Sequence, residues 1–231
     1  MNKPDTLASA AIRVEGLGKS YTTAAGPVAA LRDVSWTVPA GSAIAIMGPS
    51  GCGKTTLLNL LGGMDKATSG RILVHDSDVT AMSERALEDY RLRRVGFVFQ
   101  FFNLIPTLSA RENLELPMVL ADVPAAERRD RADALLTTVG LKEKGHKRPE
   151  ELSGGEQQRI AICLALVNDP PLILADEPTG NLDTANVEIV TELLVSLSTK
   201  QGKTVIVACH DPKVVEAFPT VYRMRDGVFV T

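Results

Sequence analysis

Short apolar runs separated by polar, glycine-rich turns recur along the chain. The runs at residues 42–47, 172–176 and 204–209 are nearly continuous in apolar residues, which is typical of strands covered on both faces of a parallel sheet. Residues 94–99 indicate a further strand. A glycine-rich turn and the helix-forming leucines of residues 55–61 follow the first run. This order of strand, turn and helix predicts the opening of a βαβ unit.

The two ends of the chain show a different pattern. Within residues 11–38, β-rich runs at 11–15 and 34–38 flank a segment of Thr, Ala, Gly and Pro at 22–27. This arrangement predicts a small, mostly antiparallel layer with a loop at that segment. Near the C-terminus, residues 225–227 read Arg-Asp-Gly between two short β-rich stretches and predict a hairpin.

Residues 101–169 form a third region, with helical periodicity at 125–139 and little strand signal. Four prolines interrupt it: Pro106, Pro117, Pro124 and Pro149. We therefore expect a single domain, with an α/β core from residues 1–100 and 170–231 and an inserted helical subdomain at about 101–169. A later helix is expected in the core, with one apolar face made of Ile189, Val190, Leu193, Leu194 and Leu197.

Charge and cysteine content narrow the class of protein. The net charge of −3 argues against bulk nucleic-acid binding, which needs a basic face, so the basic runs at 91–94 and 142–148 are expected to be solvated faces. Cys52, Cys163 and Cys209 show no CxxC pairing. An odd number of unpaired cysteines favours a reducing, cytosolic setting over disulfides or zinc.

The chain shows no feature that would place it in a membrane by itself. Residues 1–11 lack a basic stretch followed by a long apolar run, so we expect no signal peptide. No apolar run approaches the length needed to cross a bilayer. If the protein acts on a membrane, another chain must supply the span, and we expect peripheral attachment at the cytoplasmic face.

One segment carries a specific phosphate-binding pattern, G-x-x-x-x-G-K-[ST]. Its residues are Gly48, Pro49, Ser50, Gly51, Cys52, Gly53, Lys54 and Thr55. Glycines allow the backbone N–H groups to wrap an anion at the positive end of the following helix. Lys54 is expected to reach the β- and γ-phosphates and Thr55 to ligate Mg²⁺, while the side chain of Cys52 is expected to point away. The alternative is a glycine turn that only joins two core elements.

Two similar patterns do not carry the same meaning. Gly18-Lys19-Ser20 resembles the end of a phosphate loop, but Arg13 stands where the earlier glycine is required. Residues 2–5 read Asn-Lys-Pro-Asp and match a guanine-selecting pattern. They precede the first strand and the phosphate loop, where they could not contact the base. We therefore expect adenine rather than guanine.

The apolar run at 172–176 ends in two carboxylates, Asp176 and Glu177. A parallel strand places its C-terminal residues at the ligand edge of an α/β sheet. Asp176 is then expected to bind Mg²⁺, directly or through water, and Glu177 to act as general base on the attacking water. The alternative is an apolar strand that merely ends in acidic residues.

Residues 152–159 read Leu-Ser-Gly-Gly-Glu-Gln-Gln-Arg and resemble the signature sequence of ABC-type ATPases, the nucleotide-binding subunits of ATP-binding-cassette transporters. Other motifs follow in that family's order: Tyr21, Gln100, Asn181, Leu182, Asp183 and His210. The resemblance spans residues 12–227. It implies an α/β fold with a P-loop NTPase (RecA-like) core, an N-terminal antiparallel layer and an inserted helical subdomain, which hydrolyses ATP to ADP and phosphate with Mg²⁺.

The resemblance also implies individual roles. Tyr21 would stack on adenine, Gln100 would contact Mg²⁺ and the nucleophilic water, and His210 would sense the γ-phosphate. Thr56, after the phosphate loop, and Asp183, in the loop after the second carboxylate, would contribute to nucleotide binding. Two alternatives stay open, because a strand-end aromatic can serve local packing alone and a lone histidine is usually unremarkable.

Ser153, Gly154 and Gly155 form a polar, glycine-rich turn at the start of a helix expected at residues 157–167, a second potential anion-binding helix end. One chain does not need two such ends for one triphosphate. The resemblance implies that this turn closes over ATP held by a second, identical subunit, with two-fold symmetry. The alternative is an ordinary capped helix.

The loop at residues 101–106 is unusually apolar for a segment that leaves a strand. It would suit a short helix from a transmembrane permease subunit, and we expect that partner to dock near the loop after Gln100. The alternative is that these residues pack inside the helical insert.

Softer motifs at 167–170, 180–183 and 224–227 resemble the branch that serves lipoprotein release, macrolide-type export and cell division. They imply a chain that drives export or extraction of lipoprotein, peptide or hydrophobic cargo. Two alternatives stay open. A regulator of cell-wall hydrolysis would use the same motor without transport, while ATPases acting on DNA or ribosomes usually carry two cassettes or long coiled-coil inserts, which this chain lacks.

Overall fold

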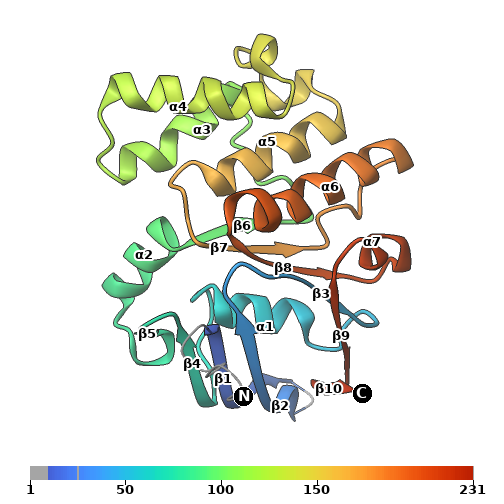
Figure 1. Ribbon diagram of the computed structural model, residues 1–231. Helices are drawn as coiled ribbons and strands as arrows, with labels where there is room; N and C mark the ends of the chain where they lie inside the picture. Colours follow the sequence, from blue (N-terminus) through green and yellow to red (C-terminus); the bar gives the residue numbers. More distant parts are fainter. Residues whose placement is uncertain (1–9, 25, 231) are drawn as a thin grey trace, which may run out of the picture.

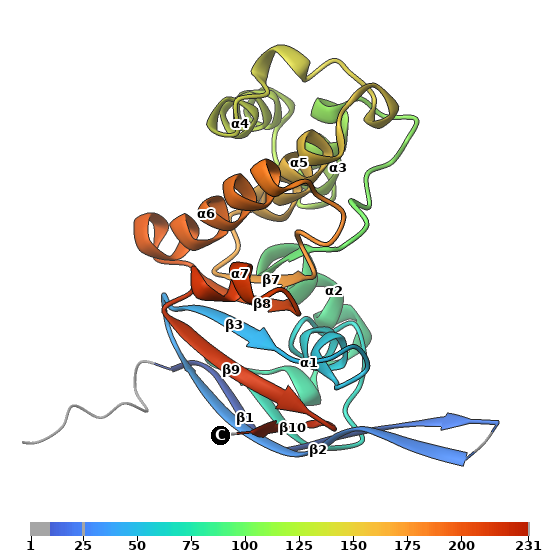
Figure 2. The same ribbon diagram turned by 90° about the vertical axis from the view of Figure 1, so that its right-hand side faces the viewer.

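The computed structural model describes residues 10–24 and 26–230. The expectations for the first nine residues, namely the lack of a signal peptide and the guanine-like Asn2-Lys3-Pro4-Asp5 segment, lie outside the described part. Figures 1 and 2 show a chain built from two sheets with helices between and above them. Among the described residues, no helix is both long enough and apolar enough to cross a membrane.

The N-terminal layer is an antiparallel sheet with strand order β2-β1-β4-β5. Its strands are β1 (Ala10–Thr23), β2 (Gly26–Pro39), β4 (Ser69–Val74) and β5 (Ser77–Asp78). The predicted layer is confirmed, but the predicted loop at 22–27 is wrong. Strand pairing continues to Thr23 opposite Gly26, so the hairpin extends beyond the rest of the molecule (Figure 2). Pro27 is tolerated because β2 lies at the edge of the sheet.

The second sheet has the order β10-β9-β3-β8-β7-β6. Its strands are β3 (Ala43–Met47), β6 (Val95–Val98), β7 (Leu172–Asp176), β8 (Thr204–Cys209), β9 (Thr220–Arg225) and β10 (Val228–Val230). The five strands from β9 to β6 are parallel, and β10 forms the predicted hairpin with β9. Met47 lies opposite Cys209, and Asp176 opposite Ala208. The carboxyl ends of β3, β7 and β8 therefore share one edge.

The helices are α1 (Lys54–Leu61), α2 (Glu84–Arg93), α3 (Ala110–Leu120), α4 (Ala125–Thr138), α5 (Gly154–Leu166), α6 (Thr184–Gln201) and α7 (Pro212–Glu216). Three short 3₁₀ turns are η1 (Val79–Ala81), η2 (Lys142–Lys144) and η3 (Pro149–Glu151). Helix α5 begins three residues before the predicted 157. Ser153 and Glu156 form a reciprocal capping box that starts the helix there.

Buried apolar residues form three clusters. The first lies between the two sheets around α1, the second covers the opposite face of the parallel sheet beneath α6, and the third joins α3, α4 and α5 (Figure 1). Each cluster contains one buried cysteine: Cys52, Cys209 and Cys163, respectively. On α6, Val190, Leu194 and Leu197 are fully buried, whereas Ile189 is exposed, so the predicted apolar face is narrower than its pattern indicated.

Candidate functional site

The phosphate-loop sequence joins β3 to α1 at the shared carboxyl edge of the parallel strands. Gly53, the residue before α1, has φ 109°, and Gly51 has φ 78°, values that favour glycine. A Cβ at Gly48 would lie 2.2 Å from the carbonyl oxygen of Met224. Cys52 is buried in the first cluster, so its side chain points into the core, as the sequence predicted.

Lys54 lies across this loop instead of reaching into solvent. Its Nζ atom donates hydrogen bonds to the carbonyl oxygens of Gly48 (2.7 Å) and Pro49 (3.2 Å). The same atom is 3.8 Å from Oε1 of Glu177, although the two residues are far apart in sequence. A cation that is only 6% exposed is thus held at the helix N-terminus, where an anion would bind.

Asp176 ends β7 and contacts the first turn of α1. The Thr55 hydroxyl hydrogen-bonds to its carboxylate, while its Oδ1 atom is buried without a hydrogen-bond partner among the described residues. Burial raises the pKa of Asp176, and the neighbouring charge of Glu177 adds to the rise, against the opposing effects of Thr55 and Lys54. A buried carboxylate oxygen of this kind needs a cation or a donor.

Glu177 follows β7 with φ 48°, and its N–H donates to the carbonyl oxygen of Ala208 (2.8 Å). This bond fixes the turn that aims its side chain toward His210, whose Nδ1 is 2.8 Å from Oε2 of Glu177. The His210 side chain is 63% exposed and that of Glu177 only 17%. Both residues line a cavity of about 240 Å³ that continues along Gly180 and Leu182.

Gln100 lies next to the same loop. Its carbonyl oxygen accepts a hydrogen bond from Asn181 Nδ2 (3.1 Å), and its side-chain amide lies beside Gly180. Asp183, two residues beyond Asn181, caps α6 by accepting a hydrogen bond from the backbone N–H of Asn186 (2.9 Å). The structure therefore brings Gln100, the loop after Glu177 and the start of α6 together.

Tyr21 is on the long hairpin and is 39% exposed. Its hydroxyl donates to Oδ2 of Asp65 (2.8 Å), and Thr56 of the first turn of α1 lies nearby. Burial and the bond to Asp65 raise the pKa of Tyr21, against the opposing contribution of Thr56. The predicted base-stacking residue thus lies beside the phosphate loop.

The signature turn is built differently. Ser153 is exposed and caps α5, and Gly154 lies within contact distance of Phe102 and Asn181. Among the described residues, no hydrogen bond or ion pair joins Ser153, Gly154 or Gly155 to the phosphate loop of the same chain. The structure therefore does not bring these three predicted residues to the cluster around Lys54.

The protein-family profile described as "ABC transporter" matches residues 31–180, which is more than half of the sequence. The chain belongs to the ABC transporter family. It is an ATP-binding cassette of the P-loop NTPase fold and an ATP hydrolase.

Three relatives illustrate the branch. The cassette is 50% identical to an ABC transporter ATP-binding protein of Thermotoga maritima, covering 90% of the cassette and 89% of the relative. It is 44% identical to the lipoprotein-releasing system ATP-binding protein LolD of Treponema pallidum, covering 95% and 97%. It is 47% identical to the macrolide export ATP-binding/permease protein MacB of Brucella abortus, where 94% of the cassette spans only 33% of that longer protein.

A solved structure shows the same fold. The ATP-binding cassette MJ0796, determined as a dimer in a post-hydrolysis state bound to ADP and Pi, superposes with a TM-score of 0.88. It is 38% identical in sequence, and the match covers 95% of this cassette and 97% of MJ0796.

Sequence reasoning missed contacts that depend on distant segments. Asp65 and Lys19 surround Tyr21, and Asn186 contacts both Asp183 and Arg159. Asp65 and Asn186 belong to no motif that we singled out. The only local signal was Lys19 in the discarded Gly-Lys-Ser pattern, and it pointed to a different chemistry.

Proposed function

We propose that this cassette hydrolyses ATP within a head-to-tail homodimer and thereby drives a membrane permease. The observation that carries the proposal is the position of Glu177. Its carboxylate is within reach of both His210 and Lys54 at the edge where the phosphate loop begins α1. Such a cluster provides an anion site, a base and a residue that can report on the γ-phosphate.

The donor set around Asp176 fits Mg²⁺. The buried, unpartnered Oδ1 of Asp176 and the adjacent Thr55 hydroxyl are hard oxygen donors of the kind that Mg²⁺ prefers, with the remaining ligands supplied by phosphates and water. Among the described residues, no group of three or more His, Cys, Asp or Glu forms a metal site by itself. This agrees with an ion that binds together with nucleotide. When bound, Mg²⁺ would neutralise charge on the phosphates.

The remaining site residues have separate roles in ATP binding and hydrolysis. Glu177 accepts a proton from the attacking water, His210 orients Glu177 and contacts the γ-phosphate, and Gln100 approaches from the side of Gly180. Lys54 exchanges the carbonyl oxygens of its own loop for phosphate oxygens. Tyr21 offers a ring face to adenine.

A second copy completes the site in this proposal. The turn of Ser153, Gly154 and Gly155 begins α5 at a positive helix end, with Ser153 exposed. Within the described part of the chain, no hydrogen bond or ion pair joins it to the phosphate loop. An identical chain, rotated by a two-fold axis, would bring this turn to the γ-phosphate. The dimeric state of MJ0796 with ADP and Pi supports this arrangement.

The Glu177→Gln substitution tests this mechanism. It keeps the shape of the side chain but removes the base, so we expect turnover to fall by at least about a hundredfold while ATP binding persists. ATP should then convert the protein to a stable dimer, measured by size-exclusion chromatography with light scattering. Ser153→Arg in the same background should abolish that dimer. Normal turnover in Glu177→Gln would contradict the assignment of the base.

We further propose that the permease docks on an apolar surface at the loop after Gln100. Phe101 is 72% exposed and Ile105 39%, and Leu116 and Leu120 of α3 are exposed as well. A groove of about 650 Å³ lies between α2 and Leu120. Leu104 packs against the third cluster instead, so the alternative of packing inside the helical insert applies to this residue.

The names of the relatives support a class of partner and a class of cargo. The MacB relative is an ATP-binding/permease protein, which supports a separate or joined permease and peripheral attachment at the cytoplasmic face of the membrane. The names of the LolD and MacB relatives favour lipoprotein or hydrophobic cargo.

A further inference from the structure

The base-stacking residue of the proposed function is held by a polar cluster that no motif includes. The Tyr21 hydroxyl donates to Oδ2 of Asp65 (2.8 Å), and Lys19 Nζ donates to Oδ1 of the same carboxylate (2.6 Å). Lys19 Nζ also donates to the carbonyl oxygen of Lys66 (2.7 Å). The Lys19 side chain is 11% exposed and that of Asp65 27%, so the ion pair between them is partly buried, whereas the bond from Tyr21 is exposed to solvent.

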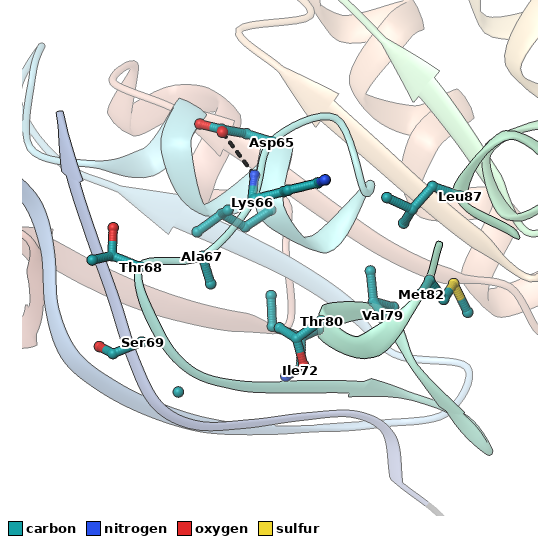
Figure 3. A pocket seen from close by; sticks show the side chains of 12 residues that line it. Asp65, Lys66, Ala67, Thr68, Ser69, Ile72, Val79, Thr80, Met82 and Leu87 are labelled. Carbon is teal, nitrogen blue, oxygen red and sulfur yellow. Dashed lines mark hydrogen bonds between the residues drawn. The ribbon is translucent and has the colours of Figure 1, made fainter. Parts of the chain in front are cut away.

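The loop that carries Asp65 depends on these polar bonds for its position. Residues 65–69 line one side of a cavity of about 220 Å³ and face Val79 and Leu87 across it (Figure 3). Ala67 of this loop packs against the first apolar cluster, while the cavity leaves part of the space behind the loop unfilled. Two further hydrogen bonds hold the loop to the hairpin, from Thr68 N–H to the Gly18 carbonyl oxygen (2.9 Å) and from Ser20 N–H to Thr68 Oγ1 (3.0 Å).

The charge state of Asp65 favours a strong hydrogen bond to Tyr21. Burial alone would raise the pKa of Asp65, but hydrogen bonds from Lys19, Tyr21 and the Lys66 N–H lower it below its usual range. Asp65 is therefore a carboxylate at neutral pH, and the bond from the Tyr21 hydroxyl is charge-assisted. Such a bond restricts rotation of the ring more than a neutral bond would.

The same cluster selects one face of the ring. Lys19 Nζ lies 4.7 Å from the centroid of the Tyr21 ring, so the ammonium group covers one face. A base must then stack on the other face. Thr56, on the first turn of α1, lies near enough to lower the pKa of Tyr21, and Asp65 follows the end of that helix. The ring is therefore positioned relative to both ends of α1, and the phosphate loop leads into the N-terminus of this helix.

We infer that Asp65, together with Lys19, is a positioning residue that pre-orients Tyr21 for adenine. It contributes to recognition of the base and has no part in binding the triphosphate. Pre-orientation lowers the conformational cost of binding. The inference rests on the proposed function, because it assumes that Tyr21 stacks on the base.

Steady-state ATPase kinetics of the purified protein test the inference. Asp65→Asn and Tyr21→Phe should each raise KM for ATP roughly three- to tenfold and leave kcat within about twofold. The double variant should be no worse than the poorer single variant, because both changes break the same bond. Inhibition by inorganic tripolyphosphate, which has no base, should stay unchanged in every variant.

Asp78→Asn is the matched control. Asp78 lies in β5 of the same sheet and bonds to Arg71 and Thr80, and neither bond involves Tyr21. The KM of the Asp78→Asn variant for ATP should therefore equal that of the unmodified protein. A purely structural role of Asp65 would weaken tripolyphosphate inhibition in parallel with ATP, or would give additive effects in the double variant. Either result would overturn the inference, as would an unchanged KM in Asp65→Asn.

Tyr21→Ala separates the inference from the proposed function. If Tyr21→Ala raises KM by more than tenfold and Asp65→Asn has no effect, the positioning role of Asp65 is contradicted and the stacking role of Tyr21 is supported. If Tyr21→Ala leaves KM unchanged, both the stacking role of Tyr21 and the positioning role of Asp65 are contradicted.

Discussion

At the scale of single residues, several glycines are required by neighbours that are distant in sequence. A Cβ at Gly155 would lie 2.0 Å from Oδ1 of Asn186. Asn186 cannot move freely, because its amide donates to the Asp183 carboxylate (3.0 Å) and its Oδ1 accepts from Arg159 (2.9 Å). The turn that the sequence identified as a candidate anion site is thus closely packed against the start of α6.

We therefore predict that Gly155→Ala lowers the free energy of unfolding by about 1–3 kcal/mol, the usual cost of overpacking. Gly154→Ala is the control, because its Cβ would meet Phe102 at an ordinary 3.7 Å, and its stability should change little. Chemical denaturation measures both. In an Asn186→Ala background the cost of Gly155→Ala should largely disappear, and an equal cost in both backgrounds would contradict this explanation.

At the scale of elements, α3, α4 and α5 pack on one another around a separate apolar cluster. That cluster is smaller than the two clusters that cover the faces of the parallel sheet. We propose that the helical segment at about 101–169 is a subdomain that loses its structure more easily than the core. Each cluster contains one cysteine, so thiol reactivity can report on each one separately.

We predict that Cys163 becomes reactive at a lower denaturant concentration than Cys52 and Cys209, which should react together. Burial raises the pKa of Cys163 and of Cys209 to about 12, and the thiolate is the reactive form. The native protein should therefore resist alkylation. Mass spectrometry after pulsed alkylation identifies the modified cysteine at each concentration. Simultaneous labelling of all three would show that the chain unfolds as one cooperative unit.

At the scale of the whole molecule, the candidate site lies at the carboxyl edge of the parallel sheet. Exposed apolar side chains occur at Phe101 and on α3. The sequence predicted contact with the permease for the loop at residues 101–106 as a whole, but Phe102 is half-buried and lies beside Gly154. Changing Phe102 would therefore disturb the signature turn as well. Phe101 is the better probe, because its side chain contributes little to the fold.

We predict that Phe101→Ser leaves the ATPase rate of the isolated cassette unchanged within about twofold and weakens co-purification with a co-expressed permease chain by at least about fivefold. Loss of a large apolar side chain from the centre of an interface commonly has an effect of this size. Ile189→Ser is the control, because Ile189 is similarly apolar and exposed but belongs to α6. Undiminished recovery of the permease with Phe101→Ser would exclude this surface.

The sequence by itself determined the fold class, the β-layer, the phosphate loop and the two carboxylates. These features depend on local patterns: apolar runs of strand length, glycines at a strand-to-helix turn, and acids at the end of a buried strand. Local patterns failed at the hairpin, where Thr and Pro suggested a loop at 22–27 and cross-strand pairing extended both strands instead.

Only the tertiary structure decided which distant residues meet. The contacts of Tyr21 with Asp65 and of Lys54 with Glu177 depend on the order and register of strands in two sheets, which no local pattern encodes. Tertiary packing also decided which side chains are exposed. Phe101 and Leu104 are both apolar, but Phe101 is exposed whereas Leu104 packs against the third cluster. Local physical chemistry thus selects the elements, and their packing selects the neighbours of each side chain.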